Sequence, residues 1–392
     1  MSSLAWIDFD EAERQRAQRI MRFFNGRESR DELGLGAIRD SIADHLFPGT
    51  STIQTRLRYM LFIPWLFQML EQRGGSESEI RAEARRLEVK LAKALEAAGE
   101  RNKGIIGGDA GERLQRLPSS VYWAGLGSWG IRRFPGSVSS LFATLCHRGS
   151  SFALASGGDV GRGRRESLWV ATLPKAPDEL LDRIGFNLRQ DEAEFIVDRL
   201  IATHRGSLLT WLARKRSAAE CDFIWTHPKL AEFPLDAQHL LGHAEIFSEV
   251  MHGAALIYNL ALSELRERDD WAADYRERLE EWRAELDLAG LEAWSLDGFW
   301  AIVAHPEHRI QPAAKRFVAE WCDLLKAGTP HLALSPVARN LVEIRERRLK
   351  KSQSRYANRA VLDRWSGASG VNRLGFRWSQ AQSHLKDLAN AR

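Results

Sequence analysis

Two carboxylates one helical turn apart are the most chemically suggestive feature of this sequence. Asp40 and Asp44 are spaced i, i+4, so they share one face of a helix predicted over residues 37–47. Paired carboxylates can activate water or stabilise a cationic sugar in a transition state. We therefore predict that Asp40 and Asp44 are the catalytic residues. The alternative is a solvated helix face on which Asp44 and His45 cap the turn.

A turn with anion-binding features follows directly. Phe47-Pro48-Gly49 precedes three hydroxyl residues where a second helix, over residues 52–72, is expected to begin. The start of a helix carries unpaired N–H groups and partial positive charge, which attract phosphate. The turn resembles the hairpin of helix-hairpin-helix DNA-binding proteins, although Ser51 replaces the second glycine. The alternative is a turn that only joins two helices. The DNA-binding residues predicted here are Thr50, Ser51, Thr52, Gln54, Arg56 and Arg58.

Aromatic residues and glycines are interleaved over residues 122–130 (YWAGLGSWG). Each glycine inside a helix costs about 1 kcal/mol relative to alanine, so their density indicates a packing or binding demand. A flat ligand held between the rings would explain them, and Arg132 and Arg133 follow where a phosphate clamp would lie. A glycine-lined helix crossing is the alternative. The predicted base pocket consists of Tyr122, Trp123, Trp129 and Trp378.

The clearest basic region lies over residues 345–378, where arginines and lysines are interleaved with aromatic residues. Basic side chains track a nucleic-acid backbone, and aromatic rings stack on its bases. We predict that Arg359, Arg373 and Arg377 contact DNA. A merely solvated helix face is the alternative.

His239 and His243 have the i, i+4 spacing of zinc ligands, but the general-base glutamate of a metalloprotease is absent beside His239. We interpret both as polar positions on a long helix over residues 235–265, with a metal site as the alternative. The sequence also lacks a Walker loop, a dinucleotide fingerprint and a nucleophile elbow. We expect no metal and no organic cofactor.

Composition indicates an ordinary globular protein. Of its 392 residues, 44% are hydrophobic and 28% are charged, and Lys+Arg 56 nearly balances Asp+Glu 52. The 14 tryptophans suit either a core or base stacking. The cysteines, Cys146, Cys221 and Cys322, show no disulfide or metal spacing, which favours a reducing cytoplasm. The longest apolar run, over residues 60–70, is too short to span a bilayer, so we expect no membrane association.

Helical periodicity dominates, and alternating strand–helix units are absent. We predict a mainly α, multi-helix globular protein with at most a minor β element, a short strand over residues 169–173. Further helices are predicted over residues 12–24, 77–98, 269–286, 311–326 and 336–351. Three segments are expected: an N-terminal helical domain (1–147), a flexible basic loop with the short strand (148–177) and a C-terminal helical domain (178–392).

Several of these segments resemble one uncharacterised bacterial family whose members are often encoded near anti-phage defence genes. They are residues 3–9, 40–65, 122–131, 252–260 and 365–378, and FPGTSTIQTR is the most specific part. The sequence also resembles the defence DNA glycosylases that remove glucosylated hydroxymethylcytosine from phage DNA. That resemblance implies excision of a modified base to leave an abasic site. No known catalytic residue aligns, so the roles given above come from local chemistry.

We therefore expect a cytoplasmic DNA glycosylase of anti-phage defence, acting on modified phage DNA, with other defence proteins as partners. Such an enzyme extrudes its target nucleotide and stabilises positive charge on the sugar. One alternative is a non-catalytic DNA-binding subunit of a multi-gene defence system. Another is a helical scaffold whose tryptophan-rich faces bind a partner protein.

Overall fold

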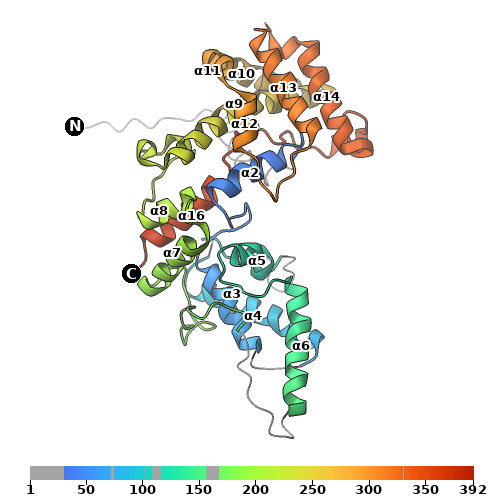
Figure 1. Ribbon diagram of the computed structural model, residues 1–392. Helices are drawn as coiled ribbons and strands as arrows, with labels where there is room; N and C mark the ends of the chain where they lie inside the picture. The colour runs from blue at the N-terminus through green and yellow to red at the C-terminus, as the bar shows by residue number, and fades with distance from the viewer. Residues whose placement is uncertain (1–30, 72–74, 102, 108–115, 156–166, 330) are drawn as a thin grey trace, which may run out of the picture. The chain divides into compact units, whose positions relative to one another are not determined.

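The computed structural model describes residues 31–71, 75–101, 103–107, 116–155, 167–329 and 331–392. Within these ranges the protein is helical and no strand forms (Figure 1). The mainly α class is confirmed. The strand predicted over residues 169–173 is reduced to a single β-bridge between Arg132 and Trp169. The helix predicted over residues 12–24 lies outside the described residues.

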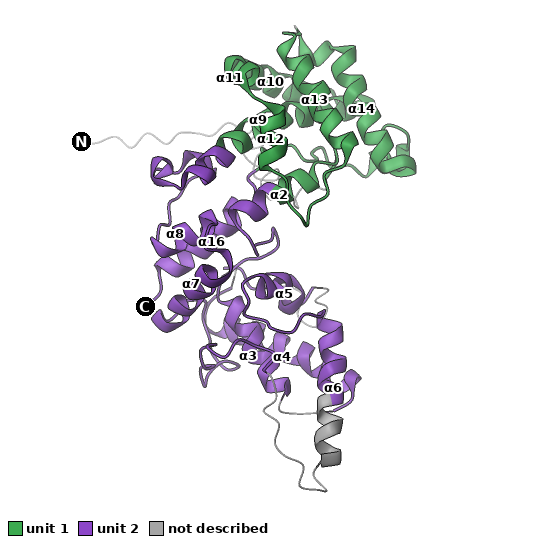
Figure 2. Ribbon diagram, viewed as in Figure 1, with its two compact units in different colours: residues 1–41, 242–374 green, residues 42–241, 375–392 purple. Residues whose placement is uncertain are grey.

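The chain divides into two compact units, each discontinuous in sequence (Figure 2). Unit 1 comprises residues 1–41 and 242–374, and unit 2 comprises residues 42–241 and 375–392. Two of the three boundaries fall within helices, α2 (Gly36–Leu46) and α9 (Leu235–Leu265), and the third lies between Leu374 and Gly375. This division differs from the three contiguous segments predicted, because the last residues of the chain pack with unit 2 through contacts that sequence order does not reveal.

Unit 2 contains α3 (Tyr59–Glu71), α4 (Glu77–Ala97), α5 (Pro118–Ser128), α6 (Val138–Ala155), α7 (Gln190–His204), α8 (Leu208–Arg214), η2 (Ile224–Thr226), η3 (Leu230–Glu232) and α16 (Trp378–Ala389). Its α3 is buried on all sides over Tyr59–Phe67, because it packs against both α4 and α5. The helix continues through Pro64. In turn, α4 packs against α6, and α16 packs against α8. The apolar α3 is therefore the centre of the α3–α6 part of unit 2.

Two predicted boundaries in unit 2 are wrong. The helix expected to begin at residue 52 begins at Tyr59, and α6 continues to Ala155 where a loop was expected from residue 148. The late start of α3 has a physical cause, described below: the backbone of residues 50–58 is bonded to side chains from elsewhere in the chain.

Unit 1 contains α9 after residue 241, α10 (Asp269–Glu285), α11 (Leu288–Ala293), α12 (Leu296–Ile302), α13 (Pro312–Lys326), η4 (Leu332–Leu334), α14 (Pro336–Lys350), η5 (Lys351–Gln353) and α15 (Arg359–Asp363). Its core forms around α9, whose residues 250–262 are all buried. Trp282 of α10 donates its indole N–H to the Glu249 carbonyl at 3.0 Å, and Trp321 of α13 donates to the Val250 carbonyl at 2.9 Å. The predicted bounds of these long helices are confirmed to within one residue.

Two further predictions can be compared with the structure. Among the described residues, none of the helices has both the length and the apolar character needed to cross a bilayer. Cys146, Cys221 and Cys322 are all free thiols. Burial raises the pKa of Cys322 to about 12, so this thiol is not a nucleophile at neutral pH.

The contact between Gly253 of α9 and Trp282 provides a test of core packing. A Cβ at Gly253 would collide with the Trp282 ring, so Gly253→Ala should lower stability by about 1–3 kcal/mol through overpacking. Gly242→Ala, on the same helix but in open space, should instead stabilise by up to about 1 kcal/mol. Thermal unfolding of both variants measures the difference, and equal melting temperatures would contradict this account of the core.

Candidate functional site

Each of the two predicted catalytic carboxylates on α2 is bound to an arginine. Asp40 Oδ1 lies 3.2 Å from the guanidinium of Arg39, and Asp44 Oδ1 lies 2.5 Å from Nη1 of Arg377. Arg377 also donates to the Thr50 carbonyl at 2.9 Å. Asp40 belongs to unit 1, whereas Asp44 belongs to unit 2. Among the predicted site residues, Arg377 therefore contacts both Asp44 and Thr50, whereas Asp40 has a different partner.

His204 and Ser128, which sequence reasoning missed, lie near Asp44. His204 Nε2 is 2.9 Å from the Ser128 carbonyl and 2.8 Å from its hydroxyl. A carbonyl only accepts, so Nε2 carries the proton, and the Ser128 hydroxyl has no base facing it there. Burial lowers the pKa of His204, while the Ser128 carbonyl and the charge of Asp44 oppose that shift. The two residues are 76 positions apart, so no motif spacing indicated them.

The predicted anion-binding helix start after the Phe47–Gly49 turn is wrong. Residues 50–58 form no helix, and most of their N–H groups donate to acceptors within the protein. Within the turn, Thr50 N–H donates to the Phe47 carbonyl at 3.2 Å, and Ser51 N–H donates to Gln54 Oε1 at 3.2 Å. Because the helix begins only at Tyr59, residues 50–52 do not present the N–H groups of a helix start.

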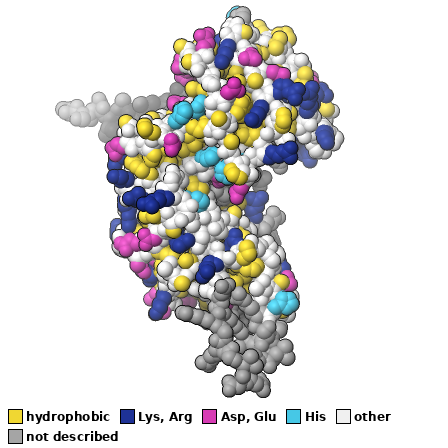
Figure 3. Space-filling model, viewed as in Figure 1, with side chains coloured by type: hydrophobic (Ala, Val, Ile, Leu, Met, Phe, Trp, Pro, Cys, Tyr) yellow, Lys and Arg dark blue, Asp and Glu magenta, His cyan; other side chains and the backbone are white. Residues whose placement is uncertain are grey.

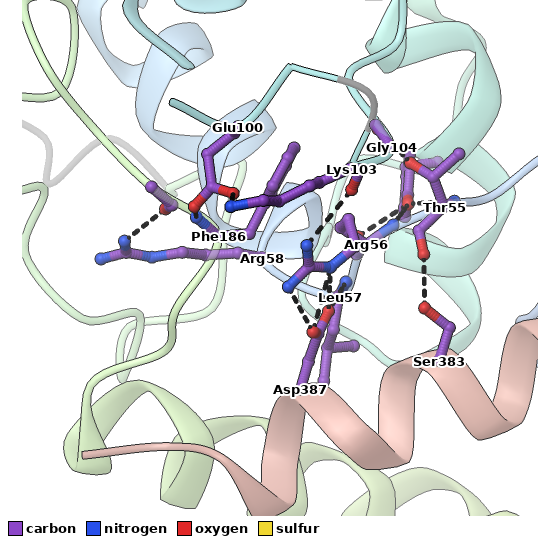
Figure 4. A network of polar contacts seen from close by, with 12 residues as sticks. Thr55, Arg56, Leu57, Arg58, Glu100, Lys103, Gly104, Phe186, Ser383 and Asp387 are labelled. Atoms are coloured by element: carbon purple, nitrogen blue, oxygen red, sulfur yellow. Dashed lines mark hydrogen bonds and ion pairs between the residues drawn. The ribbon is translucent and has the colours of Figure 1, made fainter. Parts of the chain in front are cut away.

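The remainder of this segment is held by α16 and α5. The Tyr122 hydroxyl accepts from the N–H groups of Thr55 and Arg56, at 2.8 and 3.0 Å. Asp387 on α16 accepts from the Arg56 guanidinium at 2.6 Å and from Leu57 N–H at 2.8 Å (Figure 4). A non-helical backbone is thus kept in place by two buried side chains. The ion pair with Asp387 also gives Arg56 a structural role.

Most of the other predicted phosphate ligands have internal partners too. Arg58 is buried against Glu192 at 2.8 Å. Arg132 lies over the Trp123 ring at 4.7 Å and donates to nearby carbonyls, and Arg373 of unit 1 is bound to Glu249 at 2.7 Å. Among the predicted arginines, Arg133 and Arg359 are the exposed ones.

The predicted base pocket is wrong, because its rings are part of the core of unit 2. Tyr122, Trp129 and Trp378 are at most 1% exposed, and Trp123 is 9% exposed. The indole N–H groups of Trp123, Trp129 and Trp378 each donate to a backbone carbonyl at 2.9 Å. The glycines serve close packing instead, since Gly125 lies directly against the Gly49 carbonyl. The structure thus favours the alternative reading, a glycine-lined crossing.

Of the two histidines on α9, His243 has a hydrogen-bond partner within the fold. His243 Nδ1 accepts from the Trp294 indole N–H at 2.8 Å. Over the part of the chain that the structure describes, no group of three or more His, Cys, Asp or Glu side chains is arranged to hold a metal ion.

A cavity of about 40 Å³ in unit 1 contains a further polar group, His252. Its Nδ1 has no hydrogen-bond partner among the described residues. Burial and the charges of Arg373 and Arg278 lower the pKa of His252 to about 3, so the ring is neutral at physiological pH. A cavity of this size admits water but no substrate.

An exposed basic surface lies at the end of α14 and beyond it, where Figure 3 shows Lys and Arg side chains gathered on unit 1. Two carboxylates lie among these residues, with Arg347 bound to Glu343 at 2.7 Å and Arg359 bound to Asp363 at 3.1 Å. We use the name basic strip for the exposed basic residues of this stretch, which are Arg347, Arg348, Lys351, Arg359 and Arg364.

Among the described carboxylates, Glu88 of α4 has the most strongly shifted pKa. It lies in the helix that the sequence predicted over residues 77–98. It accepts from the backbone N–H of Ser119 at 2.7 Å and from the Ser119 hydroxyl at 2.8 Å, and so caps the start of α5. Burial raises its pKa from the ordinary 4.5 to about 7, although the bonds from Ser119 oppose that shift. Glu88 therefore exchanges its proton near neutral pH.

The fold and these surfaces define an all-α protein of two compact units with an exposed basic strip. The chain belongs to the Family of unknown function (DUF6361), which matches residues 1–392. No curated protein and no solved structure matches it.

The raised pKa of Glu88 predicts an unusual pH dependence of stability. The folded state holds the Glu88 proton between pH 4.5 and 7, whereas the unfolded state has released it. Stability should therefore fall by about 3 kcal/mol as pH rises through this window. Glu88→Gln should remove that component, while Glu77→Gln, an exposed site on the same helix, should retain it. Denaturant unfolding at several pH values measures this, and parallel curves for wild type and Glu88→Gln would contradict it.

Proposed function

We propose that this protein is a DNA-binding protein that uses the basic strip of unit 1 to contact the phosphate backbone, as a non-catalytic subunit of a multi-gene defence system would. The observation that supports this proposal is the exposure of Arg347, Arg348, Lys351, Arg359 and Arg364 within one short stretch. Arginine and lysine on a surface supply the electrostatic part of nucleic-acid affinity.

The surroundings of the strip favour contact with phosphates over contact with bases. Trp365, the tryptophan nearest in sequence, is 3% exposed, and the hydroxyl of Tyr356 is buried. Rings in these positions offer no platform on which a base can stack. Phosphate contacts carry no sequence information directly, so binding should be largely independent of sequence.

The two carboxylates of the strip are compatible with this role. The pairs of Arg347 with Glu343 and of Arg359 with Asp363 are half-exposed or exposed, and such surface pairs contribute at most about 1 kcal/mol. A phosphate can therefore replace the carboxylate at little cost. Arg348 and Lys351 are exposed as well, in the same stretch of the sequence.

A charge-reversal experiment tests the DNA-binding proposal. The triple variant Arg348→Glu, Lys351→Glu and Arg364→Glu should bind a fluorescent 30-base-pair duplex at least 100-fold more weakly than wild type. The slope of log affinity against log salt should become shallower by about 3, because about one phosphate contact is lost per residue. Fluorescence anisotropy at several salt concentrations gives both quantities.

The matched control reverses three exposed basic residues of unit 2, through Lys93→Glu, Arg205→Glu and Arg214→Glu. It changes the net charge by the same amount away from the strip. Equal loss of affinity in both triple variants would show a general charge effect and would refute a role for the strip.

A second candidate function, DNA glycosylase, is favoured by one observation in unit 2. Asp44 is 19% exposed, lies against Arg377 and is near His204. A carboxylate so placed could stabilise positive charge on a sugar, with Arg377 binding an adjacent phosphate. Because the rings of the predicted base pocket are buried in the core, an extruded base would have to bind at other residues.

Alkali treatment separates the two candidates. Modified phage DNA incubated with a glycosylase acquires abasic sites and breaks on heating in alkali, whereas unmodified DNA stays intact. Asp44→Asn should abolish these breaks, and Asp40→Asn, one turn away on α2, should leave them unchanged. Wild-type protein that binds DNA but yields no breaks would eliminate the glycosylase and leave the binding role.

A further inference from the structure

One helix of unit 1, α14, exposes apolar side chains along a single face. Leu334, just before the helix, is 69% exposed, Val337 is 67% exposed and Ile344 is 38% exposed, and Leu341 between them is half-buried. Positions 337, 341 and 344 are spaced i, i+4, i+7, so their side chains lie on one face of α14. We call these four residues the α14 stripe. Apolar residues scattered singly over a surface are ordinary, whereas a continuous row marks an interaction surface.

The α14 stripe is distinct from the face by which α14 packs into unit 1. The residues of that packing face are buried, and they are Ala338, Val342, Arg345 and Glu346. The helix packs against α13. It therefore has a buried face and a separate apolar face, as a helix does when it also binds another segment.

The α14 stripe ends in positive charge. Arg348 lies four residues after Ile344, on the same face, and Lys351 follows at the end of the helix. Both side chains are exposed. The stripe contains no acidic residue, so a second copy of the stripe would offer these cations no opposite charge. A matching segment must combine several apolar residues with a short run of acids.

The chain leaves the described structure beside this helix. The described residues begin at residue 31, and Arg345 of α14 donates to the carbonyls of Leu33 and Gly34 at 2.8 and 3.1 Å. Arg345 lies one turn beyond Leu341 of the α14 stripe. The residues before position 31 are therefore attached next to the stripe.

Residues 4–11 (LAWIDFDE) have the composition that the α14 stripe requires. They are the apolar Leu4, Trp6, Ile7 and Phe9 and the acidic Asp8, Asp10 and Glu11, with Ala5 between them. Residues 12–30 contain six arginines and two glutamates, so they are basic and do not match the charged end of the stripe. The 20 residues from position 11 to position 31 can span up to about 70 Å. Because α14 is only about 22 Å long, the whole stripe is within reach.

We propose that residues 4–11 bind the α14 stripe of the same chain, with their apolar side chains on the stripe and their carboxylates facing Arg348 and Lys351. Attachment within one chain gives the segment an effective concentration on the order of millimolar, so a weak contact is sufficient. The same segment from a second copy is the competing occupant, and it lacks this advantage. The contact does not rest on the proposed DNA binding, although both involve Arg348 and Lys351.

Photo-cross-linking in the full-length chain tests this contact. Trp6 is replaced by the photoreactive amino acid p-benzoylphenylalanine, and the peptides joined by irradiation are identified by mass spectrometry. We expect cross-links to residues 334–344, in material that migrates as a single chain. Ile344→Asp should lower their yield about 10-fold, because it removes an apolar contact and introduces a charge. Leu288→Asp on α11, where the leucine is 39% exposed, is the matched control and should leave the yield unchanged.

An exchange of charges provides a second test. Arg348→Glu combined with Lys351→Glu should lower the cross-link yield, and adding Asp10→Lys and Glu11→Lys should restore it, because opposite charges then face one another again. Thermal unfolding of each variant checks that the fold is intact.

Three outcomes would overturn the proposal. Cross-links between two chains, with a yield that rises with protein concentration, would assign the contact to a second copy. Cross-links confined to residues outside 334–344 would place the segment elsewhere. Equal yields from Ile344→Asp and Leu288→Asp would show that the stripe is not involved. DNA is absent from these experiments, so their failure is distinct from a failure of the DNA-binding proposal.

Discussion

The need to satisfy buried backbone groups shapes the centre of unit 2. Residues 50–58 run without helical bonds, and buried N–H groups left unpaired would each cost about 1–3 kcal/mol. The Tyr122 hydroxyl pairs with two of these amides, and Asp387 pairs with a third. Because these side chains come from α5 and α16, the segment fixes both helices against the start of α3. A turn that looked available for phosphate is thereby committed to holding the fold together.

Tryptophan has a similar structural use throughout the chain. Trp65, Trp129 and Trp378 in unit 2, and Trp282 and Trp321 in unit 1, bury the ring and donate the indole N–H to a backbone carbonyl. Each ring thus fills core volume and also satisfies a carbonyl, which an aliphatic side chain cannot do. The high tryptophan content therefore reflects the packing of helices in both units.

Ion pairs within the protein also determine which arginine side chains are available to bind a ligand. Arg58 is committed to Glu192 and Arg373 to Glu249, so these arginines stabilise the fold. The arginines and lysine of the basic strip in unit 1 remain exposed. The proposed DNA binding depends on the exposed arginines, because an exposed guanidinium group can exchange a weak surface partner for phosphate.

Helical periodicity in the sequence by itself determined the mainly α class and the extents of α10, α13 and α14, because each of these helices buries one face that the spacing reveals. The extent of α9 was predicted from its long apolar run, and its residues 250–262 are buried on all sides. The density of arginine near the C-terminus likewise located the basic strip. Glu88 lies within a helix that the sequence predicted, although no sequence pattern marked this carboxylate as buried.

Only the tertiary structure decided which of these charges are available and where α3 begins. Asp387 lies 331 residues from Arg56, and Tyr122 lies 67 residues from Thr55, so no local pattern could indicate that the 50–58 backbone would be bonded rather than helical. The burial of Trp123 and Trp129 was decided in the same way. An aromatic residue beside glycines fits a ligand pocket and a close-packed crossing equally well, and the neighbours that distinguish them come from distant parts of the chain.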